Sequence, residues 1–566
     1  MKCEEYIYER PDIDQAEQAT SQLISRFISE KSAAGQIGIL REINGIRNRI
    51  QTMMDLCYIR YTVNTEDPFY QKEQEYMDEI APRLEDISAK LYRALLSSPF
   101  RKELEAAFGK QLFLLAAAHV KTISPEILPL LERENKLTSN YTQLVASAQI
   151  EFQGKKLTLA QLEPYAESAD RMIRKQATEA RFSFYAEHEK QLDELYDELV
   201  RVRTEAAVKL GFNNFVELGY SRLSRVDYQP QMVKGYREQI KQYIVPLAAK
   251  LREKQKLRIG VDSLKFYDEA FQFTTGNPKP QGDADWIMSN GKKMYGELSP
   301  ETDEFFQFML ERQLMDVTAK KGKAGGGYCT YIHNYRSPFI FANFNGTAGD
   351  IDVLTHEAGH AFQVFSSRDF SVPEYMWPTY EACEIHSMSM EFFTWPWMSL
   401  FFGKDTDKYQ FAHLSGAIHF MPYGAAVDEF QHRIYEHPEL TPDERKQIWR
   451  EIEREYLPHR DYDGMPYLEA GGFWQRQGHI YEVPFYYIDY TLAQICALQF
   501  WLWMNENREA AWKDYLSICQ VGGSLSFTEI VAKAGLTSPF EEGCIASVIR
   551  PIEEWLLQKA EQMKNL

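Results

Sequence analysis

The chain has 566 residues, of which 44% are hydrophobic and 26% charged, and its formal net charge is −19. This length predicts two or three lobes or one large helical domain, because a single small core cannot organise so many residues. The acidic excess argues against a nucleic acid as partner, since phosphate recognition needs a basic face.

The first half of the chain is expected to be helical. Residues 14–145 read as long amphipathic helices with apolar residues at helical spacing, and Asp67 followed by Pro68 is typical of a helix start. Residues 149–159 alternate in polarity around a glycine, which predicts a short hairpin. Helices are expected to resume over residues 168–257.

The second half is expected to carry two short strands among further helices. A loop rich in Pro and Gly at residues 274–283 separates it from the first half. Aromatic and apolar residues predict strands at 327–332 and 339–344. Helices are expected from residue 350 onward, apart from a loop at 461–478. The elements together predict a mainly α-helical protein.

The cysteine pattern and the hydropathy of the chain indicate the cellular compartment in which the protein acts. The seven cysteines are scattered and form no C-x-x-C pair, so neither a disulfide framework nor a thiolate zinc site is expected. Residues 1–14 are charged and lack the apolar core of a signal peptide. The longest apolar run, residues 112–118, is far shorter than a membrane span. We therefore expect a cytoplasmic protein without a membrane partner.

The main chemical motif is His-Glu-Ala-Gly-His at residues 356–360. On a helix, His356 and His360 project from the same face one turn apart, and each can offer an imidazole nitrogen to one Zn²⁺. Glu357 follows the first ligand and can take the proton of a water molecule that zinc activates. The pattern therefore predicts the zinc site of a peptidase, with Glu357 as its general base.

A third zinc ligand is expected about twenty residues later, on a predicted helix at 380–391. Helical spacing by itself leaves four candidates open, which are Glu381, Glu384, His386 and Glu391. Glu384, Ser387 and Glu391 share one helical face. This arrangement favours a ligand with hydrogen-bonding support from its own helix.

Beyond these residues, the sequence resembles the thimet oligopeptidase and oligoendopeptidase F group of zinc metallopeptidases, which includes Pz-peptidase-like enzymes. The group's H-E-x-G-H motif is followed by E-x-x-S-x-x-x-E, which reads here over residues 384–391. A Lys- and Gly-rich segment at 323–329 and a His followed by a Tyr-rich run at 479–490 also resemble the group. Gln363 departs from the pattern, because many members carry there a histidine that is not a ligand.

The resemblance implies roles for individual residues. It selects Glu384 as the third zinc ligand, beside His356 and His360. It implies that His479, Tyr487 and Tyr490 act as hydrogen-bond donors to the oxygen that becomes negatively charged during catalysis. The implied fold is mainly α-helical, with two lobes flanking a deep substrate channel and a small β-sheet near the active site.

The predicted function is a zinc-dependent endopeptidase that hydrolyses internal bonds of short, unstructured peptides. Residues 1–283 contain no catalytic motif and are expected to form one channel wall, whereas residues 284–566 are expected to hold the zinc site. Short peptides are the expected substrates, and no nucleic-acid or membrane partner is expected. The sequence leaves undecided whether the chain forms a homo-oligomer. The alternatives are an exo-acting carboxypeptidase or dipeptidase of the same architecture, an inactive peptide-binding scaffold, and a helical structural protein with a chance motif. The intact Glu357 argues against a pure scaffold, because binding alone needs no base.

Overall fold

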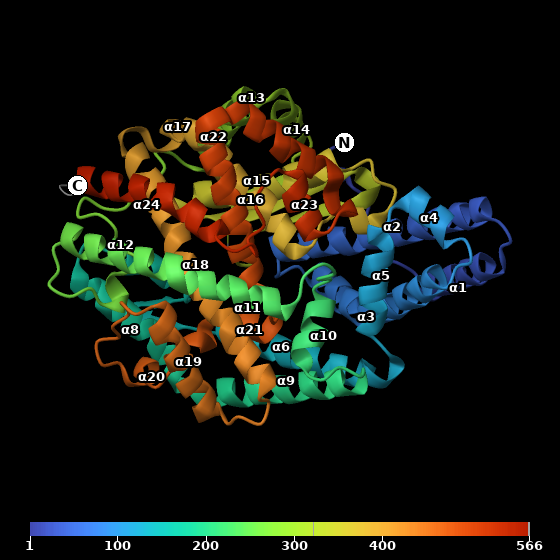
Figure 1. Ribbon diagram of the computed structural model, residues 1–566, viewed down its shortest axis with the longest axis horizontal. Helices are drawn as coiled ribbons and strands as arrows, with labels where there is room; N and C mark the ends of the chain where they lie inside the picture. The colour runs from blue at the N-terminus through green and yellow to red at the C-terminus, as the bar shows by residue number, and fades with distance from the viewer. Residues whose placement is uncertain (321, 564–566) are drawn as a thin grey trace.

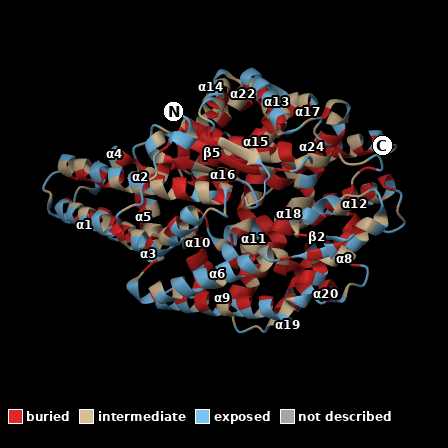
Figure 2. Ribbon diagram, turned by 180° about the vertical axis from the view of Figure 1, so that it is seen from behind, coloured by how far each residue is buried: buried red, intermediate tan, exposed pale blue. Residues whose placement is uncertain are grey.

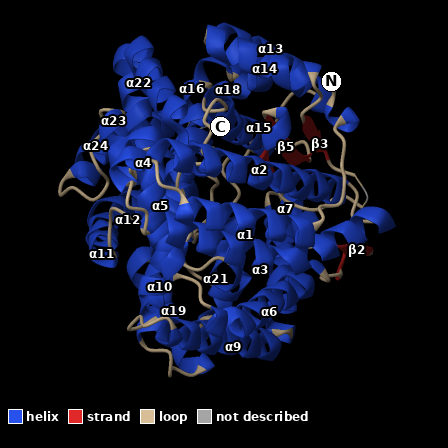
Figure 3. Cartoon of the chain, turned by 90° about the vertical axis from the view of Figure 1, so that its right-hand side faces the viewer, coloured by secondary structure: helices blue, strands red, loops and turns tan. Residues whose placement is uncertain are grey.

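The computed structural model describes residues 1–320 and 322–563. It shows a mainly α-helical protein, as predicted. Helices dominate the cartoon in Figure 3, and the strands are confined to two small sheets. Among the described residues, no single helix is long and apolar enough to cross a membrane. One bent pair, Gln111–Lys121 with Pro125–Val145, meets that threshold by length and composition alone.

Six helices precede the first strand, in agreement with the helical pattern of residues 14–145. They are α1 (Ile13–Ser29), α2 (Ala33–Val63), α3 (Pro68–Leu96), α4 (Arg101–Phe108), α5 (Gln111–Lys121) and α6 (Leu128–Ala146). The predicted helix start at Asp67 and Pro68 is confirmed, because the Asp67 side chain accepts hydrogen bonds from the amides of Phe69 and Tyr70.

The predicted hairpin forms between β1 (Ile150–Phe152) and β2 (Lys155–Leu157), which pair antiparallel. Its two turn residues, Gln153 and Gly154, have φ of 49° and 73°, as a tight two-residue turn requires. The helices that follow are α7 (Glu163–Ala166), α8 (Arg171–Glu187), α9 (Glu189–Lys209), α10 (Phe215–Arg222), α11 (Pro230–Gln239) and α12 (Val245–Arg258), with a π-helical turn at Ile240–Ile244.

A three-stranded sheet lies beside the helix that carries the His-Glu-Ala-Gly-His motif. Its strands are β3 (Met315–Thr318), β4 (Tyr328–Ile332) and β5 (Ser337–Phe344), in the order β3-β5-β4. β5 pairs parallel with β3 and antiparallel with β4. The two predicted strands are confirmed, but β3 was not predicted, because its four half-exposed residues are too few for a clear alternating pattern. Among the described strands, β4 is an edge strand.

From α15 (Gly349–Ser366) onward the chain is helical, as expected, whereas the two helices before the sheet, α13 (Ala284–Leu298) and α14 (Pro300–Glu311), were not individually predicted. The helices that follow α15 are α16 (Tyr380–Phe393), α17 (Ser399–Phe402), α18 (Thr406–Glu436), α19 (Pro442–Tyr456), α20 (Pro466–Glu469), α21 (Gly478–Glu482), α22 (Tyr487–Val521), α23 (Phe527–Lys533) and α24 (Cys544–Gln562). The predicted loop at 461–478 is interrupted by α20 and by a 3₁₀ helix at Gly472–Arg476.

Helices from distant parts of the chain lie together in space. In Figure 1, α15, α16 and α22 occupy the upper part of the molecule, α8, α9 and α19 the lower part, and α1–α5 project to one side. Figure 2 shows that buried residues concentrate where β5, α15, α16 and α18 meet. One hydrophobic cluster extends from Tyr6 to Met563, so the core joins both halves of the sequence.

Candidate metal centre and active site

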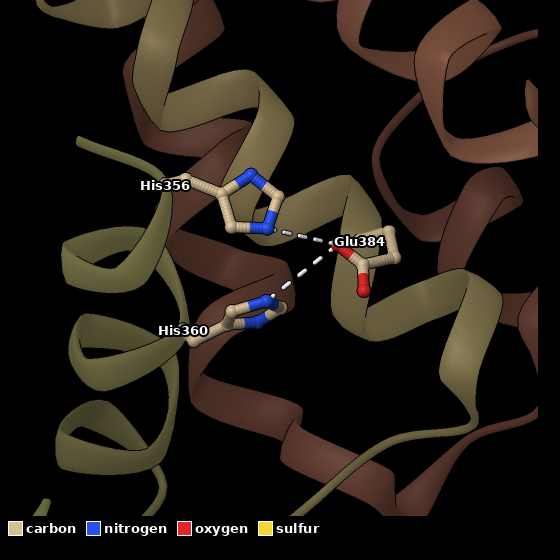
Figure 4. A group of neighbouring side chains, drawn as sticks. All are labelled: His356, His360 and Glu384. Carbon is tan, nitrogen blue, oxygen red and sulfur yellow. Dashed lines mark ion pairs between the residues drawn. The ribbon is translucent and has the colours of Figure 1, made fainter. Parts of the chain in front are cut away.

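The residues of the two motifs meet between α15 and α16. Figure 4 shows His356 and His360 pointing from α15 toward α16, and Glu384 pointing back between them. The Nε2 atom of His356 lies 3.2 Å from Oε2 of Glu384, and Nε2 of His360 lies 3.5 Å from the same oxygen. One ligand atom from each residue lies within 4.8 Å of the other two. The three side chains could therefore hold one metal ion.

The close crossing of the two helices depends on a glycine. A Cβ atom added to Gly359 would lie 2.6 Å from Cα of Ser387 and 2.7 Å from the carbonyl oxygen of His386. These are backbone contacts, so no side chain can move aside to make room. Gly359 thus lets α15 approach α16 closely enough for Glu384 to reach both histidines.

The donor set fits a zinc ion. Two imidazoles and one carboxylate are a usual set of protein ligands in catalytic zinc sites, which leave a further position open. Burial lowers the pKa of an imidazole, yet hydrogen bonds to Glu384 and Glu391 raise the pKa of His356 well above its usual value. Burial likewise opposes ionisation of Glu384, but His360 and His356 hold its pKa well below the usual range. The carboxylates of Glu384 and Glu391 therefore favour the binding of a cation between α15 and α16.

A second layer of hydrogen bonds fixes the ligands. Oε1 of Glu391 lies 2.7 Å from Nδ1 of His356, so the Nε2 atom of that ring faces the cavity. The other oxygen of Glu391 lies 2.7 Å from Nε2 of His413 on α18. The Ser387 hydroxyl donates to Oε2 of Glu384 at 2.8 Å. Such partners orient ligands and strengthen metal binding.

Of the four acidic or imidazole candidates on α16, Glu384 is the one that reaches the histidine pair. Glu381 is buried, and neither of its carboxylate oxygens contacts a polar group of the motif among the described residues. The ring of His386 is bonded through Nδ1 to the carbonyl oxygen of Ala382 at 2.7 Å. Glu391 supports His356 from the opposite ring nitrogen. The structure therefore separates candidates that helical spacing left equivalent.

Glu357 lies in the wall of a cavity of about 650 Å³ that also contains the three candidate ligands. Its side chain is buried, and its Oε2 atom has no hydrogen-bond partner among the described residues. Burial raises the pKa of this carboxyl, although the nearby imidazoles oppose the shift. Gly327, at the start of β4, leaves space beside it, since a Cβ there would lie 3.4 Å from Oε1 of Glu357. The carboxylate is therefore free to contact a molecule in the cavity.

The predicted hydrogen-bond donors divide between two cavities. Tyr490 lines the cavity that contains Glu357. His479 and Tyr487 line a neighbouring cavity of about 560 Å³, which Tyr490 also borders. The ring centroids of His479 and Tyr487 lie 4.9 Å apart. Nδ1 of His479 is 2.8 Å from the side-chain amide nitrogen, Nε2, of Gln477. Tyr490 is therefore nearer to the candidate ligands than the other two donors.

Two family models together match most of this chain. A model of the peptidase M3 N-terminal domain matches residues 3–123, and the model of peptidase family M3 matches residues 164–277 and 301–548. This chain belongs to peptidase family M3. The resemblance to the oligoendopeptidase F group that the motifs indicated is therefore confirmed.

Two curated relatives match parts of this M3 member. The group B oligopeptidase PepB of Streptococcus agalactiae is 24% identical over 390 residues, which are 65% of this chain and 61% of that protein. An oligoendopeptidase F homolog of Borreliella burgdorferi is 25% identical over 226 residues, 38% of this chain and 37% of the homolog. The chain thus spans less than two thirds of the length of the curated relatives that it matches.

Solved structures match this M3 member along its whole length. PZ peptidase A with inhibitor 2 is 61% identical, with a TM-score of 0.95 over 98% of this chain and 99% of that one. A putative oligoendopeptidase F from Bacillus anthracis str. Ames is 56% identical, with a TM-score of 0.90 over 98% of both chains. The helical fold is therefore shared with peptidases of this group.

Two side chains near the candidate metal ligands, Tyr486 and His413, were not selected in the sequence analysis. Tyr486 donates its hydroxyl hydrogen to Oε1 of Glu384 at 2.8 Å. It belongs to the Tyr-rich run at 479–490, and its position four residues before Tyr490, on the same helical face, was the signal that could have selected it. His413 had no such signal, because it lies on α18 without a recognisable motif.

Gly359→Ala tests whether the close helix crossing positions the metal site in this M3 protein. We expect destabilisation by about 1–3 kcal/mol, because overpacking against backbone forces the helices apart. Metal affinity should fall in parallel, since Glu384 is displaced from the histidines. The control is Gly45→Ala in α2, where a Cβ would meet nothing within 4 Å. That change should stabilise the helix by about 0.5–1 kcal/mol. Denaturant midpoints of the two variants check the prediction, and equal midpoints would contradict it.

Proposed function

We propose that this M3 member is a zinc-dependent endopeptidase that hydrolyses internal bonds of short, unstructured peptides. One observation carries the proposal. His356, His360 and Glu384 converge in the wall of a cavity, where the buried Glu357 presents a carboxylate oxygen without a partner among the described residues. A structural or purely binding protein has no use for an unpartnered base beside a metal-binding group.

The proposed chemistry divides between the ion and the side chains. When bound by His356, His360 and Glu384, zinc supplies a Lewis acid that lowers the pKa of water and polarises the scissile carbonyl. Glu357 takes the proton of the attacking water and passes it to the leaving amine. Tyr490 donates a hydrogen bond to the substrate oxygen as negative charge develops on it.

Support for the endopeptidase reading comes from the cavity lining. Among the described residues that line the cavity there is no Lys or Arg to hold a terminal carboxylate, which an exo-acting carboxypeptidase needs. β4 reaches the cavity as an edge strand, and an extended peptide can pair with such an edge through its backbone. We therefore favour internal cleavage of an extended chain over removal of a carboxy-terminal residue.

The N-terminal half contributes to the lining of the cavity. Tyr92 of α3 and three residues of α5, Gln111, Leu115 and His119, line it together with residues of the motif helices. This supports the division into residues 1–283 as one channel wall and 284–566 as the catalytic half. We propose that a channel lined by both halves of the chain admits an unfolded segment and excludes a folded domain.

A reducing compartment suits the cysteines. All seven, which lie within the described residues, are free, and five of them are buried. Free thiols in such number are typical of the cytoplasm, where disulfides do not persist. We propose the cytoplasm as the place of action, with short peptides as the partners.

Cleavage of a peptide ladder tests the proposal. We expect internal cuts in end-blocked peptides of roughly 5 to 20 residues, because pairing with an edge strand needs extended backbone on both sides of the bond. Native proteins should not be cut. Mass spectrometry locates each cut, and unfolded casein-sized chains form the comparison. Efficient internal cleavage of those long chains would show an open site, and release of terminal residues alone would show an exopeptidase.

Tyr490→Phe tests the proposed oxygen donor. We expect kcat to fall by an amount equal to about 2–4 kcal/mol, with little change in KM, because the hydroxyl acts mainly in the transition state. Steady-state kinetics on one quenched peptide give both constants. The control is Tyr58→Phe on α2, which removes an exposed hydroxyl. An unchanged kcat in Tyr490→Phe would transfer the role to Tyr487 or to His479.

A further inference from the structure

A second cavity, of about 520 Å³, adjoins the one that contains Glu357. Its walls come from α2, α3 and the end of β4. The two cavities share four lining residues, which are Tyr92, His119, Glu374 and Trp377. The two cavities therefore adjoin each other at these four residues.

Strand β4 runs from one cavity to the other. Gly327, Tyr328 and Cys329 line the first cavity, whereas Thr330 and Tyr331 line the second. A strand advances about 3.3 Å per residue, so Thr330 lies roughly 10 Å along it from the glycine beside Glu357. A peptide that pairs with this edge thus reaches the second cavity about three residues from the bond that is cleaved beside Glu357.

The second cavity contains a buried carboxylate with a free oxygen. Asp55 of α2 is only 8% exposed, and it lines the cavity. Its Oδ1 atom accepts hydrogen bonds from Gln51 at 3.1 Å and from Thr330 at 3.2 Å. Its Oδ2 atom has no partner among the described residues. Burial raises the pKa of Asp55 to about 7, which reflects the cost of a buried negative charge that lacks a cation.

The cationic groups around this cavity are already committed. Arg47 forms an ion pair with Glu374 at 2.7 Å. Burial lowers the pKa of His333 to about 4, so its ring is neutral near pH 7. Nε2 of His119 is buried, has no hydrogen-bond partner among the described residues, and lies 3.5 Å from Oε2 of Glu85. No cationic side chain among the described residues pairs with the carboxylate of Asp55. A bound ligand can therefore supply the positive charge.

We propose that this second cavity is a subsite for a positively charged group of the bound peptide, with Asp55 as its counter-ion. The inference deepens the proposed peptidase function and rests on it. The group is a protonated amine or guanidinium about three residues from the scissile bond. It is either the free amino terminus or a basic side chain. A charge-assisted hydrogen bond to a buried carboxylate favours binding by about tenfold to a hundredfold.

Matched peptides test the subsite in the wild-type protein. One quenched peptide carries a free amino terminus three residues from the cut. A second is acetylated and carries lysine there, and a third is acetylated and carries norleucine, which has lysine's shape without its charge. We expect KM for at least one cationic peptide to be about tenfold or more below that of the norleucine peptide. The first two peptides show which source of charge is used. Equal KM values for all three would overturn the subsite while leaving the peptidase function intact.

Asp55→Asn tests the named counter-ion. We expect the ratio of KM values between cationic and norleucine peptides to approach one. A merely structural role would change all three peptides alike and preserve the ratio, and that result would overturn the assignment. The matched control is Asp86→Asn on α3, which removes the same charge outside the cavity and should keep the wild-type ratio. If the wild type cleaves none of the peptides, the proposed function fails and the subsite with it.

Discussion

Removal of the metal is expected to abolish peptide cleavage, and Zn²⁺ should restore it. The purified protein should carry about one zinc per chain, held by two histidines and one glutamate. Phenanthroline should remove the ion, because the site opens into a cavity of about 650 Å³ that a small chelator can enter. Elemental analysis before and after chelation, together with turnover of a quenched peptide, checks both statements. Full activity in metal-free protein would contradict the proposed function.

Two variants of α16 separate a ligand from its support. Glu384→Gln should lose zinc on dialysis, because a neutral amide replaces the carboxylate ligand. Glu391→Gln keeps all three ligands but weakens the hydrogen bond that orients His356, so zinc affinity should fall by about 10- to 100-fold. The control is Glu436→Gln at the exposed end of α18. Competition with a chelator measures the affinities, and identical values for all three variants would refute the assigned roles.

Glu357→Gln is expected to lower turnover by at least about 10²-fold, the smaller effect usual for loss of a general base. Zinc should be retained, since Glu357 is not one of the three converging residues. The physical reason is that an amide cannot accept the proton of the attacking water. Single-turnover kinetics together with zinc content per chain check the prediction.

The matched control for this change lies on the same helix. Asp350 accepts hydrogen bonds from the amides of Asn345 and Gly346, each at 2.8 Å, and lies outside the cavity lining. Asp350→Asn therefore makes the same chemical change on α15 without touching the reacting groups, and turnover should stay near that of the wild type. If Glu357→Gln lost zinc while Glu384→Gln retained it, the roles of base and ligand would be interchanged.

Local patterns predicted the elements well because their causes are local. A helix start such as Asp67 and Pro68 depends on hydrogen bonds within one turn. The hairpin at 149–159 depends on two residues that adopt positive φ. One exception is β3, whose four residues form a strand because β5 offers them a parallel partner. Its stability comes from pairing rather than from its own sequence.

The sequence by itself determined the helical class, the histidine pair on one helical face and the carboxylate between them. These follow from spacing within one helix, where residues four apart face the same way. Only the tertiary structure decided which residue of α16 meets that pair, because the answer depends on how Gly359 lets two helices cross. It also brought His413 of α18 to Glu391 and left Oδ2 of Asp55 on α2 without a hydrogen-bond partner among the described residues. Contacts between segments far apart in the chain are set by packing of the whole core, and no local pattern encodes them.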